Sequence, residues 1–135
     1  MEDQVAKITS FRDLEVWGHA MTLTERCYRA TDFFPVSERY GLSSQIRRAA
    51  ASIPANLAEG HGRSTRAFMN HVSIAIGSQA ELDTLLELGS RLSLLPAAQR
   101  EDIDENLRRT GQMLHALLRA LTRSTAGTRK TDEAH

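Results

Sequence analysis

Residues 45–60 read QIRRAAASIPANLAEG, and this stretch decides the fold. Apolar residues recur through it at intervals of three or four positions, which is the periodicity of one face of an α-helix. The residues of this face are Leu42, Ile46, Ala49, Ile53 and Leu57. The run of small residues at 49–52 lets a second helix approach closely. The sequence therefore predicts a helix that begins near residue 42 and packs tightly against its neighbours.

Pro54 lies inside this helical pattern. Proline has no backbone N–H and clashes with the preceding turn, so we expect a kink at this point. Asn56 and Glu59 flank the kink, and Asn56 is expected to donate to the carbonyl that Pro54 leaves unpaired. A ligand-binding role for this pair is the alternative. Gly60 and Gly62 are placed to end the helix.

The same periodicity appears in three further segments: about 13–31, about 65–94, and from residue 96 to about 123. Ser64 can cap the third helix, because its hydroxyl accepts from the free N–H groups of the first turn. Four amphipathic helices with short connections and no strand pattern predict an all-α, up-down-up-down four-helix bundle. We expect residues 1–10 to form a flexible lead-in, 11–123 the bundle domain, and 124–135 a disordered tail.

Length and composition exclude several classes of protein. The 135 residues contain 17 Lys and Arg and 17 Asp and Glu, so the formal net charge is zero and the chain is no simple polycation. The single Cys27 rules out an internal disulfide framework. No apolar run approaches the length of a membrane span and the N-terminus has no signal-peptide core, so we expect a cytoplasmic protein.

The zero net charge conceals clusters of one sign. Residues 101–105 hold four acids, 108–130 hold six bases and no acid, and 39–66 hold five arginines against one acid. The candidate nucleic-acid-binding residues are Arg47, Arg48, Arg63 and Arg66, which would form a basic belt if repeated around an oligomer. The alternative is that one of the Arg47–Arg48 pair faces water while the other pairs with an acid, such as Glu59 or Glu81, at a protomer interface.

A second apolar seam on the third helix exceeds what the core of one chain requires. Exposed apolar stripes of this kind usually mark contacts between subunits. The candidate interface residues are Trp17, Leu85, Leu88 and Leu92, and they predict a homo-oligomer.

No pattern of catalytic or metal-binding residues emerges from the sequence. The five histidines are scattered, whereas a metal site needs three or four converging ligands. Cys27 has no neighbouring basic cluster and is predicted to be a core or interface thiol. The sequence contains no nucleophile elbow and no glycine loop for phosphate. We therefore expect a protein that is not an enzyme and that needs no cofactor and no metal.

Three segments together resemble a known family: FRDLEVW at 11–17, ERYGLSSQIRRAAASIPANLAEGHGR at 38–63, and FMNHVSIAIGSQAELDTLLELGSRL at 68–92. The chain resembles the four-helix bundle proteins related to the ribosomal-RNA intervening-sequence proteins, a group that includes the accessory variability determinant of diversity-generating retroelements. The resemblance implies a homopentameric barrel. For the retroelement member it further implies a basic surface that binds nucleic acid and docks a reverse transcriptase. Neither branch implies catalysis.

Two functional hypotheses follow. The first is a non-enzymatic, oligomeric accessory or adaptor protein for RNA, DNA or a nucleic-acid enzyme, and it rests on the basic clusters within this fold. The second is a purely structural protein-interaction oligomer with no affinity for nucleic acid. It rests on the neutral total charge, which departs from the strongly basic retroelement member.

Overall fold

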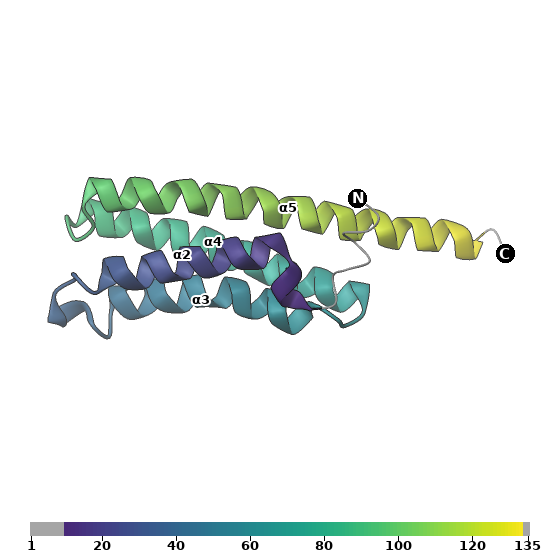
Figure 1. The fold of residues 1–135 in the computed structure, drawn as a ribbon, viewed down its shortest axis with the longest axis horizontal. Coiled ribbons are helices and arrows are strands. Elements are labelled where there is room, and N and C mark those ends of the chain that lie inside the picture. The colour runs from purple at the N-terminus through teal and green to yellow at the C-terminus, as the bar shows by residue number, and fades with distance from the viewer. Residues whose placement is uncertain (1–9, 134–135) are drawn as a thin grey trace.

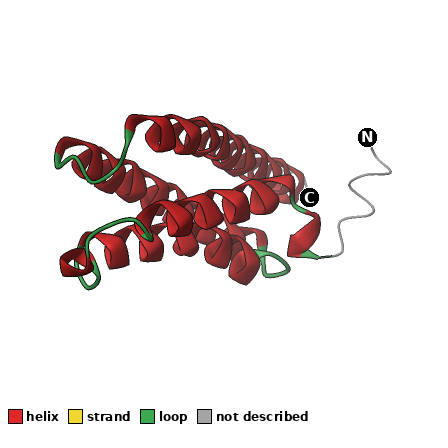
Figure 2. Cartoon of the chain, turned by 60° about the vertical axis from the view of Figure 1, so that its left-hand side comes forward, coloured by secondary structure: helices red, strands yellow, loops and turns green. Residues whose placement is uncertain are grey.

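A computed structural model describes the backbone of residues 10–133 and the side chains of residues 10–126. The predicted lead-in at 1–10 lies outside the described residues except for Ser10. A short 3-10 helix, η1 (Phe11–Asp13), precedes α2 (Glu15–Thr31), and a second, η2 (Val36–Glu38), precedes α3 (Leu42–Gly60). Two longer helices follow, α4 (Thr65–Arg91) and α5 (Ala97–Glu133). All regular structure in residues 10–133 is helical (Figures 1 and 2), which confirms the predicted all-α class.

The four long helices run alternately up and down (Figure 1). Each packs against the next along the chain, and α5 returns to pack against α2. No backbone contact joins the diagonal pairs α2 with α4 or α3 with α5 within the described residues. The pair α3–α4 therefore lies opposite the pair α2–α5. The four-helix bundle that the periodicity predicted is confirmed.

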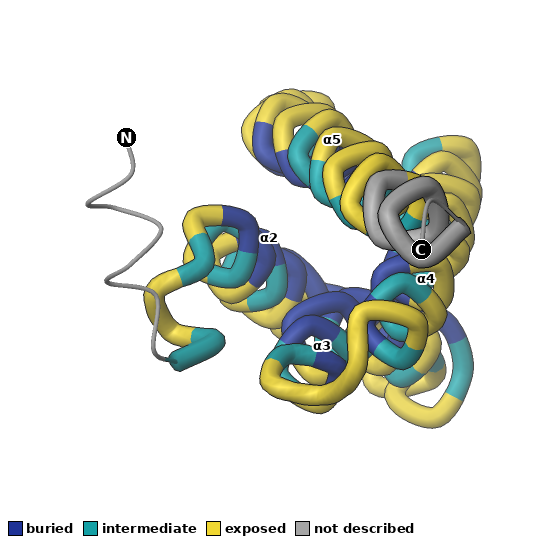
Figure 3. Tube along the Cα trace, turned by 90° about the vertical axis from the view of Figure 1, so that its right-hand side faces the viewer, coloured by how far each residue is buried: buried dark blue, intermediate teal, exposed yellow. Residues whose placement is uncertain are grey.

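The core lies where the apolar faces of the four helices meet (Figure 3). Its largest fully buried apolar side chains come from every helix: Leu23, Ile46, Ile53, Leu57, Leu82, Leu86, Ile103 and Leu114. Cys27 is buried among them, and burial raises the pKa of its thiol to about 12. The thiolate is disfavoured there, so Cys27 behaves as a small core side chain.

The C-terminal boundary differs from the prediction. α5 continues to Glu133, ten residues beyond the expected end of the bundle at 123. The Thr125 hydroxyl lies 3.5 Å from the Met69 sulfur of α4, so contacts between the two helices also extend past residue 123. Extending an existing helix is far easier than starting one, so loss of apolar periodicity does not by itself end a helix. Of the predicted tail, residues 134–135 lie outside the described residues.

Candidate functional site

Pro54 removes one hydrogen bond from the backbone of α3, and a side chain of α2 supplies the missing donor. α3 runs as one element from Leu42 to Gly60 with Pro54 inside it. The missing proline N–H would have bonded the Ala50 carbonyl four residues earlier. The Thr24 hydroxyl of α2 lies 3.1 Å from that oxygen and 2.8 Å from the Ala20 carbonyl, so it offers its proton to both. The expected donor, Asn56, instead bonds the Ser52 carbonyl at 2.8 Å, and this corrects the sequence prediction.

Thr24→Val is expected to lower the free energy of unfolding by about 1–3 kcal/mol, because it leaves the Ala50 carbonyl without a donor in a half-buried position. Valine keeps the shape of threonine and removes only the hydroxyl. Thr24→Ser keeps the hydroxyl and is the matched control, expected to lose less. Chemical denaturation of both variants checks this expectation, and equal losses would contradict it.

Asn56 takes part in a polar chain between α3 and α4. Its Oδ1 lies 3.0 Å from His71 Nδ1, and Arg63 Nη1 lies 3.1 Å from His71 Nε2. A guanidinium only donates, so His71 Nε2 accepts and Nδ1 donates to Asn56. The Ser52 hydroxyl continues the chain to Ser78 at 2.8 Å. These contacts give Asn56 and Arg63 a role in joining two helices.

The two helices approach closely beside this chain. A Cβ atom added at Gly60 would lie 2.7 Å from the His71 Cβ, a separation that real Cβ atoms essentially never show. Glycine at this position therefore permits the α3–α4 contact. Glu59, the other residue expected near the kink, is exposed on the outer face of α3.

Arg47 is committed to contacts within the chain. Its Nε bonds the Thr31 hydroxyl at 2.8 Å and its Nη2 bonds Asp32 Oδ1 at 2.8 Å. The guanidinium carbon also lies 4.7 Å from the centre of the Tyr28 ring. Arg47 thus holds the C-terminal end of α2 against α3. It pairs with an acid, as the alternative supposed, but that acid is Asp32 of the same chain.

The other predicted basic residues do not form one compact patch. Arg48, Arg63 and Arg66 are all exposed. Arg48 lies in the first half of α3, whereas Arg63 lies in the turn after that helix, beyond the end of an intervening helical stretch about 18 Å long. The structure therefore does not bring together the four arginines that the sequence singled out.

A different set of arginines lines the outer face of α5, and we call Arg108, Arg119 and Arg123 the basic stripe. All three are exposed, and none has an ion pair or hydrogen bond among the residues whose side chains are described. Arg119 follows Arg108 by eleven residues, or three turns and about 17 Å, and Arg123 lies one turn further on. The acid-free segment at 108–130 was the sequence signal, and helical spacing within it would have identified these residues.

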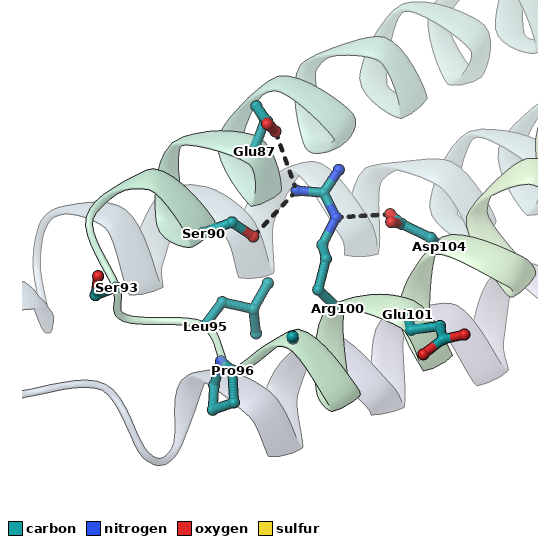
Figure 4. Close-up of a pocket in the computed structure, with 9 residues that line it drawn as sticks. Glu87, Ser90, Ser93, Leu95, Pro96, Arg100, Glu101 and Asp104 are labelled. Atoms are coloured by element: carbon teal, nitrogen blue, oxygen red, sulfur yellow. Dashed lines mark hydrogen bonds and ion pairs between the residues drawn. The ribbon is translucent and has the colours of Figure 1, made fainter.

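Acidic residues from α4 and α5 surround Arg100, among them Glu87 and Asp104 (Figure 4). Arg100 Nε bonds Asp104 at 2.7 Å, Nη2 bonds Asp83 at 3.2 Å, and Nη1 lies 3.9 Å from Glu87. The Arg100 side chain is 17% exposed, so these carboxylates converge on a largely covered cation. Part of the acidic cluster is therefore neutralised locally, between the end of α4 and the start of α5, and the basic stripe lies further along α5.

The predicted interface residues divide into two groups. Leu88 and Leu92 are 45% and 55% exposed, and Ile74, also 45% exposed, lies on the same side of α4. We call these three residues the α4 apolar stripe. Leu85 is half-buried against the core, and Trp17 packs on the core with its ring edge-on to Phe11 at 5.4 Å. Trp17 and Leu85 therefore contribute to the fold of the single chain, and their place at an interface stays a prediction.

Gly77 lies beside the α4 apolar stripe on the exposed surface of the helix. A Cβ atom added there would meet nothing within 4 Å, so packing inside the chain does not require glycine. An exposed glycine within a helix costs about 1 kcal/mol relative to alanine. The presence of glycine at this position would be explained if another molecule packed closely against α4.

Comparisons with known proteins agree with the class that this architecture defines, a four-helix bundle. The model of the 23S rRNA-intervening sequence protein family matches residues 12–116, and the chain belongs to this family. A solved structure with the same fold comes from Bacteroides thetaiotaomicron and is described as a protein of unknown function from the S23 ribosomal protein family. It is 24% identical, with a TM-score of 0.71, and the match covers 77% of this chain and 95% of that chain. No curated protein matches the sequence.

Nowhere in the described residues do three or more His, Cys, Asp or Glu side chains gather so that they could hold a metal ion. In the same residues, no helix combines the length and the apolar character needed to cross a membrane.

Proposed function

We propose that this protein is a non-catalytic, homo-oligomeric accessory protein of the cytoplasm that binds the phosphates of RNA or DNA through the basic stripe. The observation that carries the proposal is the set of exposed arginines Arg108, Arg119 and Arg123, which have no acidic partner among the described side chains. Arginine offers a planar fork of donors that matches phosphate oxygens. Unpaired arginines on one helix face are therefore suited to a phosphate backbone.

The neutral net charge is compatible with this proposal because the charges are separated along α5. The acids at 101–105 occupy the start of the helix, and Arg108 lies one turn beyond Asp104, whereas Arg119 and Arg123 lie about 22 Å and about 28 Å beyond Asp104 along the axis. A phosphate chain responds to the local field within about one Debye length, which is about 8 Å at physiological ionic strength. A local basic surface can thus bind nucleic acid on a neutral protein.

Assembly would multiply the effect of each stripe. The α4 apolar stripe supports self-association, and the resemblance to the intervening-sequence and retroelement proteins implies a ring of five copies. Several basic stripes held in one assembly raise the effective concentration of binding sites for a long polyanion. The second hypothesis, a structural oligomer without affinity for nucleic acid, shares the apolar stripe and differs only at the arginines.

Substitution of the basic stripe tests the proposal. The variant Arg108→Gln, Arg119→Gln, Arg123→Gln is expected to reduce the slope of log affinity against log salt by about 3 for a DNA duplex, because each phosphate contact contributes about 0.9. The matched control is Arg12→Gln, Arg29→Gln, Arg91→Gln, which removes the same charge from exposed arginines elsewhere and is expected to bind nearly as the unaltered protein.

Fluorescence anisotropy over a salt series gives the slopes. If the unaltered protein fails to bind RNA or DNA duplexes at low salt, the nucleic-acid function is wrong and the structural-oligomer hypothesis stands. If both triple variants bind equally well, phosphate binding lies at a surface other than the basic stripe.

A further inference from the structure

The histidines of this chain differ in whether they have a partner within it. Among the residues whose side chains are described, three of the four histidines have one. Those contacts are His19 Nε2 to Glu15 at 3.9 Å, the His61 ring edge-on to the Phe68 ring at 5.8 Å, and the His71 ring to Asn56 and Arg63. His115 is exposed and makes no hydrogen bond, ion pair or ring contact with those residues. Its imidazole is therefore available to another molecule.

His115 lies on α5 in line with the basic stripe. It follows Arg108 by seven residues, or two turns and about 10 Å, and it precedes Arg119 by one turn, or about 6 Å. Seven residues return to within about 20° of the same direction around a helix. The imidazole therefore occupies the gap between Arg108 and Arg119 on the same exposed surface.

The surface next to His115 on α5 and α4 carries no carboxylate among the described side chains. On α5, the residues one turn away on either side are Gly111, Gln112, Leu118 and Arg119. On α4, the Gln79 amide reaches the Leu107 carbonyl and Met69 meets Thr125, so residues 69–79 lie opposite this part of α5. Residues 67–80 contain no Asp, Glu, Lys or Arg.

The acids that line the same groove between α4 and α5 lie further away or are already paired. Asp83 of α4 bonds Arg100 at 3.2 Å. On α5 itself, Glu101, Asp104 and Glu105 lie about 15 Å or more along the helix from His115. α2 packs against α5 as well, and its Glu15 lies 4.0 Å from Arg109, whereas Arg109 and His115 are six residues apart. A charge on His115 therefore has no carboxylate to pair with nearby.

Protonation changes what this imidazole can bind. A histidine side chain gains a positive charge within the range from about pH 8 to about pH 5. The protonated ring has an N–H donor at both nitrogens and no acceptor. Between Arg108 and Arg119, such a ring needs an anion from outside the chain.

We propose that His115 is a pH-dependent contact of the basic stripe, whose protonated ring binds a nucleic-acid phosphate between Arg108 and Arg119. The inference rests on the proposed function and adds a regulated contact to the same site. Arginines and ordinary carboxylates keep their charges between about pH 8 and about pH 5.5, so among the groups of the stripe only the imidazole changes. The affinity for nucleic acid therefore rises as the pH falls through this range.

Fluorescence anisotropy with a DNA duplex, measured over a pH series at fixed low salt, tests this contact. One additional phosphate contact changes the slope of log affinity against log salt by about 0.9, which corresponds to about a tenfold gain in affinity at about 50 mM salt. The unaltered protein is expected to show this gain between about pH 8 and about pH 5.5. The gain is expected to shrink as salt rises, because it comes from a phosphate contact.

Three variants assign the response to one side chain. His115→Gln is expected to bind at every pH about as the unaltered protein binds at pH 8, because it has no ring to protonate. His115→Arg carries a charge throughout, so it is expected to bind at pH 8 about as tightly as the unaltered protein binds at pH 5.5. The matched control is His19→Gln, which removes a histidine from α2 and is expected to keep the full pH response.

The outcomes separate this inference from the proposed function. A pH response that persists in His115→Gln would overturn the inference, and so would an affinity of the unaltered protein that does not change with pH. Either result leaves phosphate binding by the arginines in place. If the unaltered protein binds no duplex at low salt at any pH, the proposed function itself is wrong.

Discussion

A chain carrying Leu88→Glu and Leu92→Glu is expected to be a folded monomer of 15.0 kDa under conditions in which the unaltered protein assembles. Both leucines are more than two-fifths exposed in the single chain, so the substitutions should not disturb the core. In an apolar interface, however, each added carboxylate would lose its hydration without gaining a partner. Sedimentation velocity reports the mass, and circular dichroism reports whether the helices remain.

The matched control for this variant is Gln112→Glu with Ala116→Glu. These residues are exposed on α5 with the same four-residue spacing, so the control adds the same charge to a different helix. It is expected to assemble as the unaltered protein does. Assembly of the Leu88→Glu, Leu92→Glu variant with unchanged affinity would show that the α4 apolar stripe is not the interface.

Leu82→Ala is expected to lower the free energy of unfolding by about 2–5 kcal/mol, because it leaves a cavity in a fully buried position. Leu88→Ala makes the same chemical change two turns further along α4, where the side chain is half exposed. In the unassembled chain, Leu88→Ala is expected to lower the free energy of unfolding by less than about 1 kcal/mol. Comparing the two losses of unfolding free energy therefore distinguishes the core face of α4 from its outer face.

Measuring both variants at two protein concentrations tests whether Leu88 lies at an interface. Assembly stabilises the folded state by mass action, so a residue at an interface contributes more as protein concentration rises. The loss caused by Leu88→Ala is expected to grow with concentration, whereas the loss caused by Leu82→Ala is expected to stay constant. Denaturant unfolding at two concentrations checks this, and a concentration-independent loss for both variants would contradict the interface assignment.

The helices and the core could be predicted from the sequence because both depend on local periodicity. The face of Ile46, Ile53 and Leu57 is buried as the spacing indicated. Ser64 caps α4 as expected, accepting from the Ala67 N–H at 3.2 Å. The end of α5 was placed too early because Ser, Thr and Gly residues after 123 weaken a helix without being able to stop one that has already formed.

The candidate sites could be predicted less well because they depend on contacts between distant parts of the chain. Nothing local indicates that Thr24 would serve the Ala50 carbonyl, or that Arg47 would bind Asp32. The density of arginines along the sequence favoured residues 47–66 as the nucleic-acid-binding site, although these arginines lie at separate places on the bundle. The difference between the bound His71 and the exposed His115 is visible only once the helices are packed together.

Sedimentation velocity of the protein with a fluorescent RNA duplex tests the central claim most directly, because it follows assembly and binding together. The account predicts that at low salt the label sediments with a species several times heavier than the 15.0 kDa chain. Raising the salt should release the label while the protein assembly keeps its mass, since phosphate contacts are screened and the apolar interface is not. A label that sediments as free RNA at low salt, or a protein that stays monomeric at micromolar concentration, would contradict it.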